Sequence, residues 1–430
     1  MRIKQVLHVA TVASLASALT LVPAGAASAD QVRDAQWPLE FFDADSVWEI
    51  SEGKGVTIAV IDDGFETDHP DLKENLLEGK DFIDGGDVNP SSGENHGTAM
   101  ASIIAAHGHG PEGSQGMKGL APEAKILPIR YSLQDSLADP IRYAVDQGAT
   151  VINISLGSSA SDNEEKEAVE YALENDVLIV TASGNEGGSS IGYPGGYPGT
   201  LTVGATGKDG EIWGNSNHGP EVLLTAPGVE VVTAGSSTPY RKGDGTSDSS
   251  AYTSAAAGLI RSKYPDLTAG QVVNRLVKTA GLPDSAKGIS LPDEKYGYGY
   301  IRPLAALTED IPKGSKYGPL KVPESLQSPS PGSGSGGDSG SDSGAGSNNI
   351  LKRLLVFVAA PLFLLLVIGL VVFATVKASR RKRRSAAVEA NWGEGQRSPY
   401  GQQMPPGGLS GFPPRQQGTD RDQPSGPWRP

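Results

Sequence analysis

Residues 56–64 read VTIAVIDDG, an apolar run that ends in two carboxylates and a glycine. A short apolar run bounded by a turn signal predicts a buried β-strand. A strand that ends beside a glycine turn fixes its last side chain at the edge of a sheet, where a carboxylate can orient an imidazole. Asp62 is the candidate for that role, and the adjacent Asp63 is the alternative.

Further along the chain, similar apolar runs alternate with amphipathic helical patterns. Near-continuous apolar strands spaced by helices indicate a parallel sheet covered on both faces. We therefore predict an α/β fold with a mostly parallel central sheet, in which functional groups gather at the carboxyl ends of the strands. The expected strands are Val56–Asp62, Ile126–Tyr131, Thr150–Leu156, Val177–Ala182, Leu201–Ala205 and Val222–Ala226, and the expected helices are Thr98–His107, Pro140–Gln147, Glu164–Asn175, Ser247–Lys263 and Ala269–Thr279.

The segment ENHGTAMASIIAA, residues 94–106, places His96 just before small and apolar residues suited to a buried helix. At a helix N-terminus the helix dipole favours neutral imidazole over imidazolium, unless a carboxylate compensates. Asp62 would supply that carboxylate. Of the six histidines in the chain, only His96 is followed by Gly-Thr and a predicted helix.

The segment GDGTSDSSAYTSAAAGL, residues 243–259, places Ser247 at the start of a predicted helix. The free N–H groups and the dipole at that point favour developing negative charge. Gly245 permits a close approach of backbone to substrate. An N-cap serine is the alternative reading.

A fourth segment, VLIVTASGNEG at residues 177–187, places Asn185 after a strand in a glycine-bounded loop, where its amide can donate to an oxyanion. Taken singly, each of the four residues fits a structural role as a turn acid, a core histidine, a helix cap or a turn amide. Four such motifs in one order, each beside an expected strand or helix, instead predict a catalytic Ser-His-Asp set.

The order Asp62, His96, Ser247 resembles that of the subtilisin-like serine proteases, the subtilase family, over about residues 56–307. The resemblance implies that Asp62, rather than Asp63, is the acid of the triad. It also implies that Asn185 forms the oxyanion hole with the N–H of Ser247. The same resemblance implies no cofactor. Family members often bind structural Ca²⁺, but no Asp/Glu spacing in this chain identifies a metal site.

The resemblance also predicts where an extended polypeptide substrate binds. Main-chain pairing of this kind gives affinity, and side-chain pockets give specificity. The edge that pairs with the substrate would be Ser155, Leu156 and Gly157, and the pocket for the residue before the scissile bond would be lined by Ala182, Ser183 and Gly184.

The nucleophile segment departs from the commonest family form at Asp248, where that form has an apolar residue. A carboxylate in the first helical turn suits the helix dipole, so the helix is expected to form. A negative charge beside the nucleophile can also raise the pKa of His96 or repel the oxyanion.

The composition excludes several kinds of site and argues against one class of binding partner. The chain has 430 residues, a formal net charge of −14 and no cysteine, which excludes disulfides, thiol chemistry and thiolate metal sites. Residues 352–384 hold eight Lys/Arg and no acid, so the remainder carries a formal charge of −22. An acidic body argues against nucleic acid as a partner.

The two ends of the chain predict export and membrane anchoring. Residues 1–29 have two basic residues, a mainly apolar run and a small-x-small pattern, which together indicate a signal peptide cleaved after Ala29. Residues 354–376 carry no charge and would extend roughly 35 Å as a helix, enough to span a membrane. The basic cluster that follows is expected to stay in the cytoplasm, with the body outside.

The predicted organisation has six parts. They are a signal peptide (1–29), a short N-terminal extension (30–55), a subtilisin-like peptidase domain (56–312), a Gly/Ser/Pro-rich linker (313–353), a transmembrane helix (354–376) and a basic, then Pro/Gly/Gln-rich, cytoplasmic tail (377–430).

This organisation resembles the mycosins, the membrane-anchored subtilases of actinobacterial type VII secretion systems, although mycosins usually carry disulfides. The likeness implies a single-pass protein of the cell membrane, with an extracytoplasmic serine endopeptidase domain and a type VII secretion complex as partner. The alternative is a structural or scaffolding subunit of such a complex, with weak or dispensable proteolysis. Asp248 favours the alternative, and the intact set of Asp62, His96 and Ser247 favours the enzyme.

Overall fold

The computed structural model describes residues 31–90, 96–236 and 238–327. The predicted signal peptide, the Gly/Ser-rich part of the linker from residue 328, the predicted transmembrane segment and the tail lie outside these residues. Within the described ranges, no helix is long and apolar enough to cross a membrane.

A seven-stranded sheet forms the centre of the described domain, in the order β2-β5-β1-β6-β7-β8-β9. Every neighbouring pair of strands is parallel, which confirms the predicted α/β class. The strands are β1 (Thr57–Asp62), β2 (Lys80–Asp81), β5 (Lys125–Arg130), β6 (Val151–Ile154), β7 (Leu178–Ala182), β8 (Thr200–Thr206) and β9 (Val222–Pro227).

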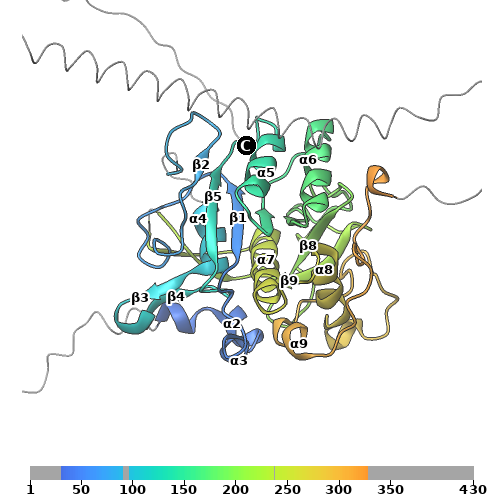
Figure 1. Ribbon diagram of the computed structural model, residues 1–430. Coiled ribbons are helices and arrows are strands. Elements are labelled where there is room, and N and C mark those ends of the chain that lie inside the picture. The colour runs from blue at the N-terminus through green and yellow to red at the C-terminus, as the bar shows by residue number, and fades with distance from the viewer. Residues whose placement is uncertain (1–30, 91–95, 237, 328–430) are drawn as a thin grey trace, which may run out of the picture. The chain divides into compact units, whose positions relative to one another are not determined.

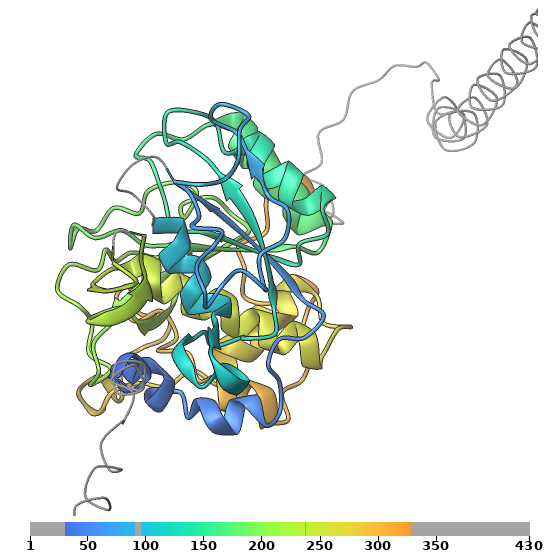
Figure 2. The ribbon, with the colours of Figure 1, turned by 90° about the vertical axis from the view of Figure 1, so that its left-hand side faces the viewer.

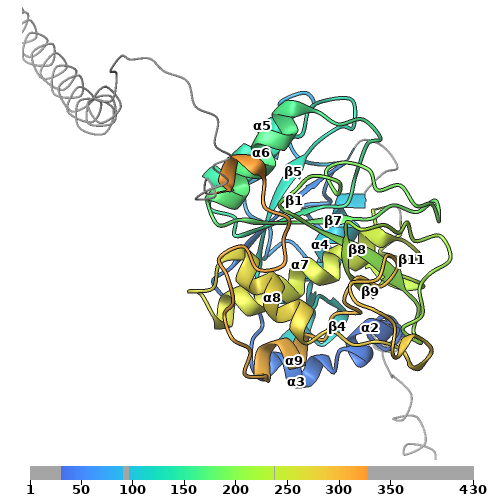
Figure 3. The ribbon, with the colours of Figure 1, turned by 90° about the vertical axis from the view of Figure 1, so that its right-hand side faces the viewer.

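Helices cover both faces of this sheet, as Figures 1 and 3 show. One face carries α4 (His96–Ala105), α7 (Thr246–Lys263) and α8 (Ala269–Lys278), and the other carries α5 (Ala138–Asp146) and α6 (Asn163–Glu174). Strand β1 serves both cores, because alternate side chains of a strand point to opposite faces. Ile58 and Val60 lie in one core, and Ala59 and Ile61 lie in the other.

Helix α7 packs against one face of the sheet and contacts β1, β6, β7, β8 and β9. Its small residues allow this close packing. At Gly258, for example, an added Cβ would lie 2.7 Å from Cδ1 of Ile58. Since α7 begins at the carboxyl edge of the sheet, this packing fixes where Ser247 stands relative to the strand ends.

The N-terminal segment packs as part of the domain. Helices α2 (Trp37–Phe41) and α3 (Ala44–Trp48) lie beside α9 (Pro303–Thr308), as Figures 1 and 2 show. The indole N–H of Trp37 donates to the carbonyl of Val229 at 3.0 Å, and that of Trp48 donates to the carbonyl of Leu120 at 3.0 Å. These contacts tie the predicted extension to segments far along the chain.

The remaining elements are short. Two antiparallel hairpins and three 3-10 helices complete the described domain. They are β3 (His107–His109) with β4 (Gln115–Lys118), β10 (Val231–Ala234) with β11 (Tyr240–Gly243), η1 (Pro111–Gly113), η2 (Asp284–Ala286) and η3 (Glu324–Leu326).

The predicted bounds of most elements differ from those of the structure by one or two residues, and at one of them the predicted element type was also wrong. The helix expected over Thr98–His107 begins at His96 and ends at Ala105, and His107 instead starts strand β3. The backbone N–H of His107 donates to the carbonyl of Asp71 at 2.8 Å, so the helical hydrogen-bond pattern has ended before this residue.

Candidate active site

The carboxyl ends of neighbouring strands bring the candidate residues together. Asp62 is the last residue of β1, Asn185 follows β7, and His96 and Ser247 stand in the first turns of α4 and α7. In open parallel sheets this edge is where ligands bind.

Asp62 contacts the imidazole of His96 directly. Both carboxylate oxygens of Asp62 lie 2.9 Å from Nδ1 of His96. The side chain of Asp62 is fully buried, whereas that of His96 is 29% exposed. Asp63 has a different partner, since its Oδ1 accepts the backbone N–H of Gly97 at 3.0 Å. Of the two adjacent carboxylates, Asp62 is therefore the one that orients the ring.

Gly97 permits the close approach of α4 to β1. A Cβ at this position would lie 2.5 Å from the carbonyl oxygen of Gly64 and 3.0 Å from Cβ of Asp62. Any larger residue would push the start of α4 away from the strand end. The glycine that follows His96 in the sequence is thus required for steric reasons.

The charges around His96 set its protonation state. Burial disfavours the imidazolium, but the charge and hydrogen bond of Asp62 outweigh it, with further help from the charges of Asp248 and Asp63. Together they raise the pKa of His96 to about 9. These charges therefore favour the imidazolium over the neutral ring.

Ser247 is 8% exposed, at the start of α7. Its hydroxyl donates to the carbonyl oxygen of Ser155 at 3.2 Å. Among the described residues it makes no hydrogen bond to the ring of His96. Hydroxyl–imidazole bonds in ligand-free active sites are often long and tighten only with substrate.

A buried polar network joins α7 to the strand edge at Ser155. The amide of Asn153 donates to the hydroxyls of Ser250 and Ser254 at 3.2 and 3.1 Å, and the hydroxyls of Ser155 and Ser250 lie 2.7 Å apart. Because these groups are fixed to one another, the position of Ser247 is tied to the edge where an extended chain would pair. Asn153, Ser250 and Ser254 were not predicted as site residues, because their one signal in the sequence is a polar residue inside a buried segment.

The side chain of Asn185 is held by Thr246. Its Oδ1 accepts both the backbone N–H and the hydroxyl of Thr246, each at 2.9 Å. These donors fix which end of the amide is oxygen. The Nδ2 group donates no hydrogen bond to any residue that the structure describes, so it is available to an oxyanion.

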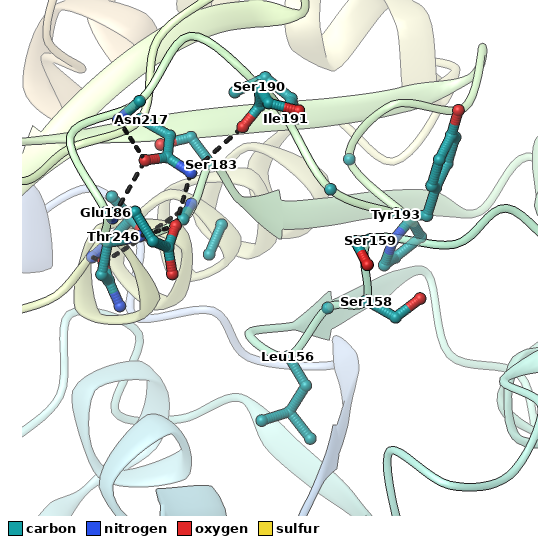
Figure 4. Close-up of a pocket in the computed structure, with 18 of the residues that line it drawn as sticks. Leu156, Ser158, Ser159, Ser183, Glu186, Ser190, Ile191, Tyr193, Asn217 and Thr246 are labelled. Atoms are coloured by element: carbon teal, nitrogen blue, oxygen red, sulfur yellow. Dashed lines mark hydrogen bonds between the residues drawn. The ribbon is translucent and has the colours of Figure 1, made fainter.

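A cleft of about 550 Å³ adjoins Ser247 and Asn185. All six residues predicted to bind substrate line it, namely Ser155, Leu156, Gly157, Ala182, Ser183 and Gly184. Figure 4 shows Leu156 on one side of this cleft and Glu186 with Asn217 on the other.

Asn217 organises the second wall of the cleft. Its Nδ2 donates to the carboxylate of Glu186 at 2.7 Å and to the carbonyl of Ser190 at 3.2 Å (Figure 4). Its Oδ1 accepts the backbone N–H groups of Glu186 and Gly188. Asn217 was not predicted as a site residue, because a single Asn in a polar loop carries no periodic signal.

No set of three or more His, Asp and Glu side chains in the described part of the chain could hold a metal ion.

Comparisons with known proteins agree with this geometry. A family model described as the subtilase family, peptidase S8, matches residues 53–299. Thermitase from Thermoactinomyces vulgaris is 34% identical over 226 residues, which cover 51% of this chain and 80% of thermitase.

Solved structures are similar as well. MycP1 from Mycobacterium smegmatis superposes with a TM-score of 0.57 at 30% identity, over 67% of this chain and 88% of the other. The MycP3 protease from the type VII (ESX-3) secretion system gives a TM-score of 0.53 at 32% identity, over 64% of this chain and 88% of the other.

We predict that Asp62→Asn lowers the pKa of His96 from about 9, because it removes the nearest negative charge while burial still disfavours the imidazolium. Titration of the ring carbons by NMR in protein labelled with ¹³C-histidine measures this. Asp68→Asn, a change of charge at an exposed site six residues away, should leave the His96 titration in place. A His96 titration that is equal in the Asp62→Asn variant and the parent would contradict the electrostatic account.

Proposed function

The chain belongs to the subtilase family and is a serine endopeptidase, and we propose that Ser247, His96 and Asp62 carry its chemistry. The observation that supports these roles most strongly is the contact of both Asp62 oxygens with Nδ1 of His96, at the sheet edge where Ser247 begins α7. This contact leaves Nε2 as the ring nitrogen that exchanges protons with substrate and nucleophile.

In the proposed mechanism, the hydroxyl of Ser247 turns from the Ser155 carbonyl towards His96 when substrate binds. Its oxygen attacks the scissile carbonyl carbon while Nε2 of His96 takes the proton. The resulting imidazolium is stabilised by Asp62 and returns the proton to the leaving amine as the C–N bond breaks. Water then attacks the acyl-enzyme by the same steps, which releases the carboxylic acid and restores Ser247.

Asn185 is proposed to stabilise the oxyanion. Its Nδ2 group has no other acceptor among the described residues, and Thr246 fixes its orientation. A donor held in place before reaction stabilises a developing oxyanion by roughly 3–4 kcal/mol, because no reorganisation is needed during the step. The backbone N–H of Ser247, at the start of α7, would be the second donor.

The substrate is proposed to be an extended polypeptide that pairs with the edge at Ser155–Gly157. The residue before the scissile bond would then enter the cleft beside Ala182–Gly184.

We expect a fluorophosphonate probe to label the full-length protein in alkaline buffer and to fail with Ser247→Ala, because the probe bonds to an activated serine oxygen. Ser249→Ala is the matched control. Its hydroxyl lies two residues away on α7, is fully buried and donates to the carbonyl of Ala226, so labelling should persist. Labelling that survives Ser247→Ala, or that is absent from the parent protein at every pH, would refute the assignment.

We further propose that the protein acts at the cell membrane, in association with a type VII secretion complex. Residues 354–376 support anchoring by their length and lack of charge. The likeness to MycP3, a protease described as part of the type VII (ESX-3) system, supports the association.

Removal of residues 350–384 should shift the protein from the membrane fraction to the soluble extracytoplasmic fraction, because both the apolar segment and its basic flank are lost. Immunoblotting of the fractions measures this. A truncated protein that still sediments with membranes would argue against the anchor.

A separate comparison tests the structural alternative. If deletion of the whole protein abolishes secretion and full-length Ser247→Ala does not, the protein is needed for its structural role and not for proteolysis.

A further inference from the structure

The first turn of α4, which carries His96, is held by the segment that directly follows β1. The backbone N–H of Gly97 donates to Oδ1 of Asp63 at 3.0 Å. The backbone N–H of Glu66 donates to Oγ1 of Thr98 at 2.8 Å. The N–H groups of a first helical turn have no acceptor within the helix, so an acceptor must come from outside it. The Asp63 carboxylate is that acceptor for Gly97.

Asp63 also contacts the carboxylate that orients the ring. Its backbone N–H donates to Oδ1 of Asp62 at 2.8 Å, and the same oxygen lies 2.9 Å from Nδ1 of His96. The backbone of Asp63 therefore holds the Asp62 carboxylate, while its side chain holds the helical turn that bears the imidazole. Because both groups belong to one residue, Asp63 links the position of the acid to that of the ring.

The first turn of α4 contains no acid of its own. A carboxylate supplied from another segment is favourable there, because it meets a free N–H and the positive end of the helix dipole. Burial and the charge of Asp62 nevertheless raise the pKa of the Asp63 carboxyl, against the hydrogen bond from Gly97 and the charge of His96. An acid kept beside another acid at this cost favours a role in the site over a role in folding alone.

We propose that Asp63 is a positioning residue, which caps α4 and so holds the His96 ring against Asp62. In this orientation Nε2 of the ring can take the proton of Ser247. This inference rests on the proposed roles of His96 and Ser247. It gives a function to the acid that the sequence offered only as an alternative to Asp62.

Loss of the cap should slow the chemistry more than it weakens binding. The described residues that line the substrate cleft do not include Asp63, so contacts within the cleft do not depend on it directly. Proton transfer from Ser247 to His96 needs close and aligned atoms, and a small displacement of the base lowers its rate. We therefore expect the maximal rate to fall while the half-saturating concentration changes little.

The first test is the kinetics of fluorophosphonate labelling of the full-length protein. Asp63→Ala removes the acceptor and should lower the maximal labelling rate about tenfold or more, with the half-saturating probe concentration changed less than about twofold. Asp63→Asn keeps an amide oxygen that can accept the Gly97 N–H, so its maximal rate should stay within about threefold of the parent. Asp68→Ala, a change at an exposed acid nearby, is the matched control and should behave as the parent.

A second measurement reports the geometry without catalysis. A short, charge-assisted hydrogen bond moves its proton far downfield in the ¹H NMR spectrum, so the proton between Nδ1 of His96 and Asp62 can be observed directly. Asp63→Ala should shift or broaden this resonance, whereas Asp63→Asn and Asp68→Ala should keep it. Asp63→Leu removes the acceptor without leaving a void, and it must show the same losses as Asp63→Ala in both measurements.

Each outcome decides one claim. Parent-like maximal rates in Asp63→Ala and Asp63→Leu, or equal losses in Asp63→Ala and Asp63→Asn, would overturn the capping role while leaving Ser247 as the nucleophile. Absence of Ser247-dependent labelling from the parent would instead overturn the proposed function. In that case the Nδ1 resonance would still decide whether Asp63 positions His96.

Discussion

The structure depends on one contact, the pairing of both Asp62 oxygens with Nδ1 of His96. It joins the last residue of a buried strand to the first turn of a buried helix. Gly97 is needed there, since any Cβ would strike the Gly64 carbonyl. The same sheet edge receives Asn185 from β7 and the start of α7, so the parallel strands bring four chemical groups to one edge of the sheet.

The sequence predicted the sheet and its covering helices well, because their signal is local periodicity. All six predicted strands form, and strand β1 ends at Asp62 as expected. The N-terminal helices α2 and α3 were missed. They are five residues each and depend on distant contacts such as that of Trp37 with Val229. The predicted helix end at His107 was wrong because the backbone N–H of His107 pairs with the distant carbonyl of Asp71 and not with the helix.

Within the site, the motif residues could be predicted from the sequence. The hydrogen bonds that hold them in place could not. His96 and Ser247 stood beside recognisable glycines, but the hydrogen bonds of Asn153 reach Ser250 and Ser254, about a hundred residues away. Asn217 similarly holds the loop of Glu186 from another part of the chain. The sequence flagged Asp248 as an unusual neighbour, whereas its burial and its lack of a donor among the described residues required the structure. The fold affects reactivity because the charges that it places around His96 set the pKa of the ring.

The most direct test of this account is a crystal structure of the full-length protein after reaction with a fluorophosphonate. We predict a bond from phosphorus to Oγ of Ser247, with the phosphoryl oxygen within hydrogen-bonding distance of Nδ2 of Asn185. His96 should remain on Asp62 through Nδ1. An adduct on another residue, or a phosphoryl oxygen directed away from Asn185, would contradict the assignment of the site.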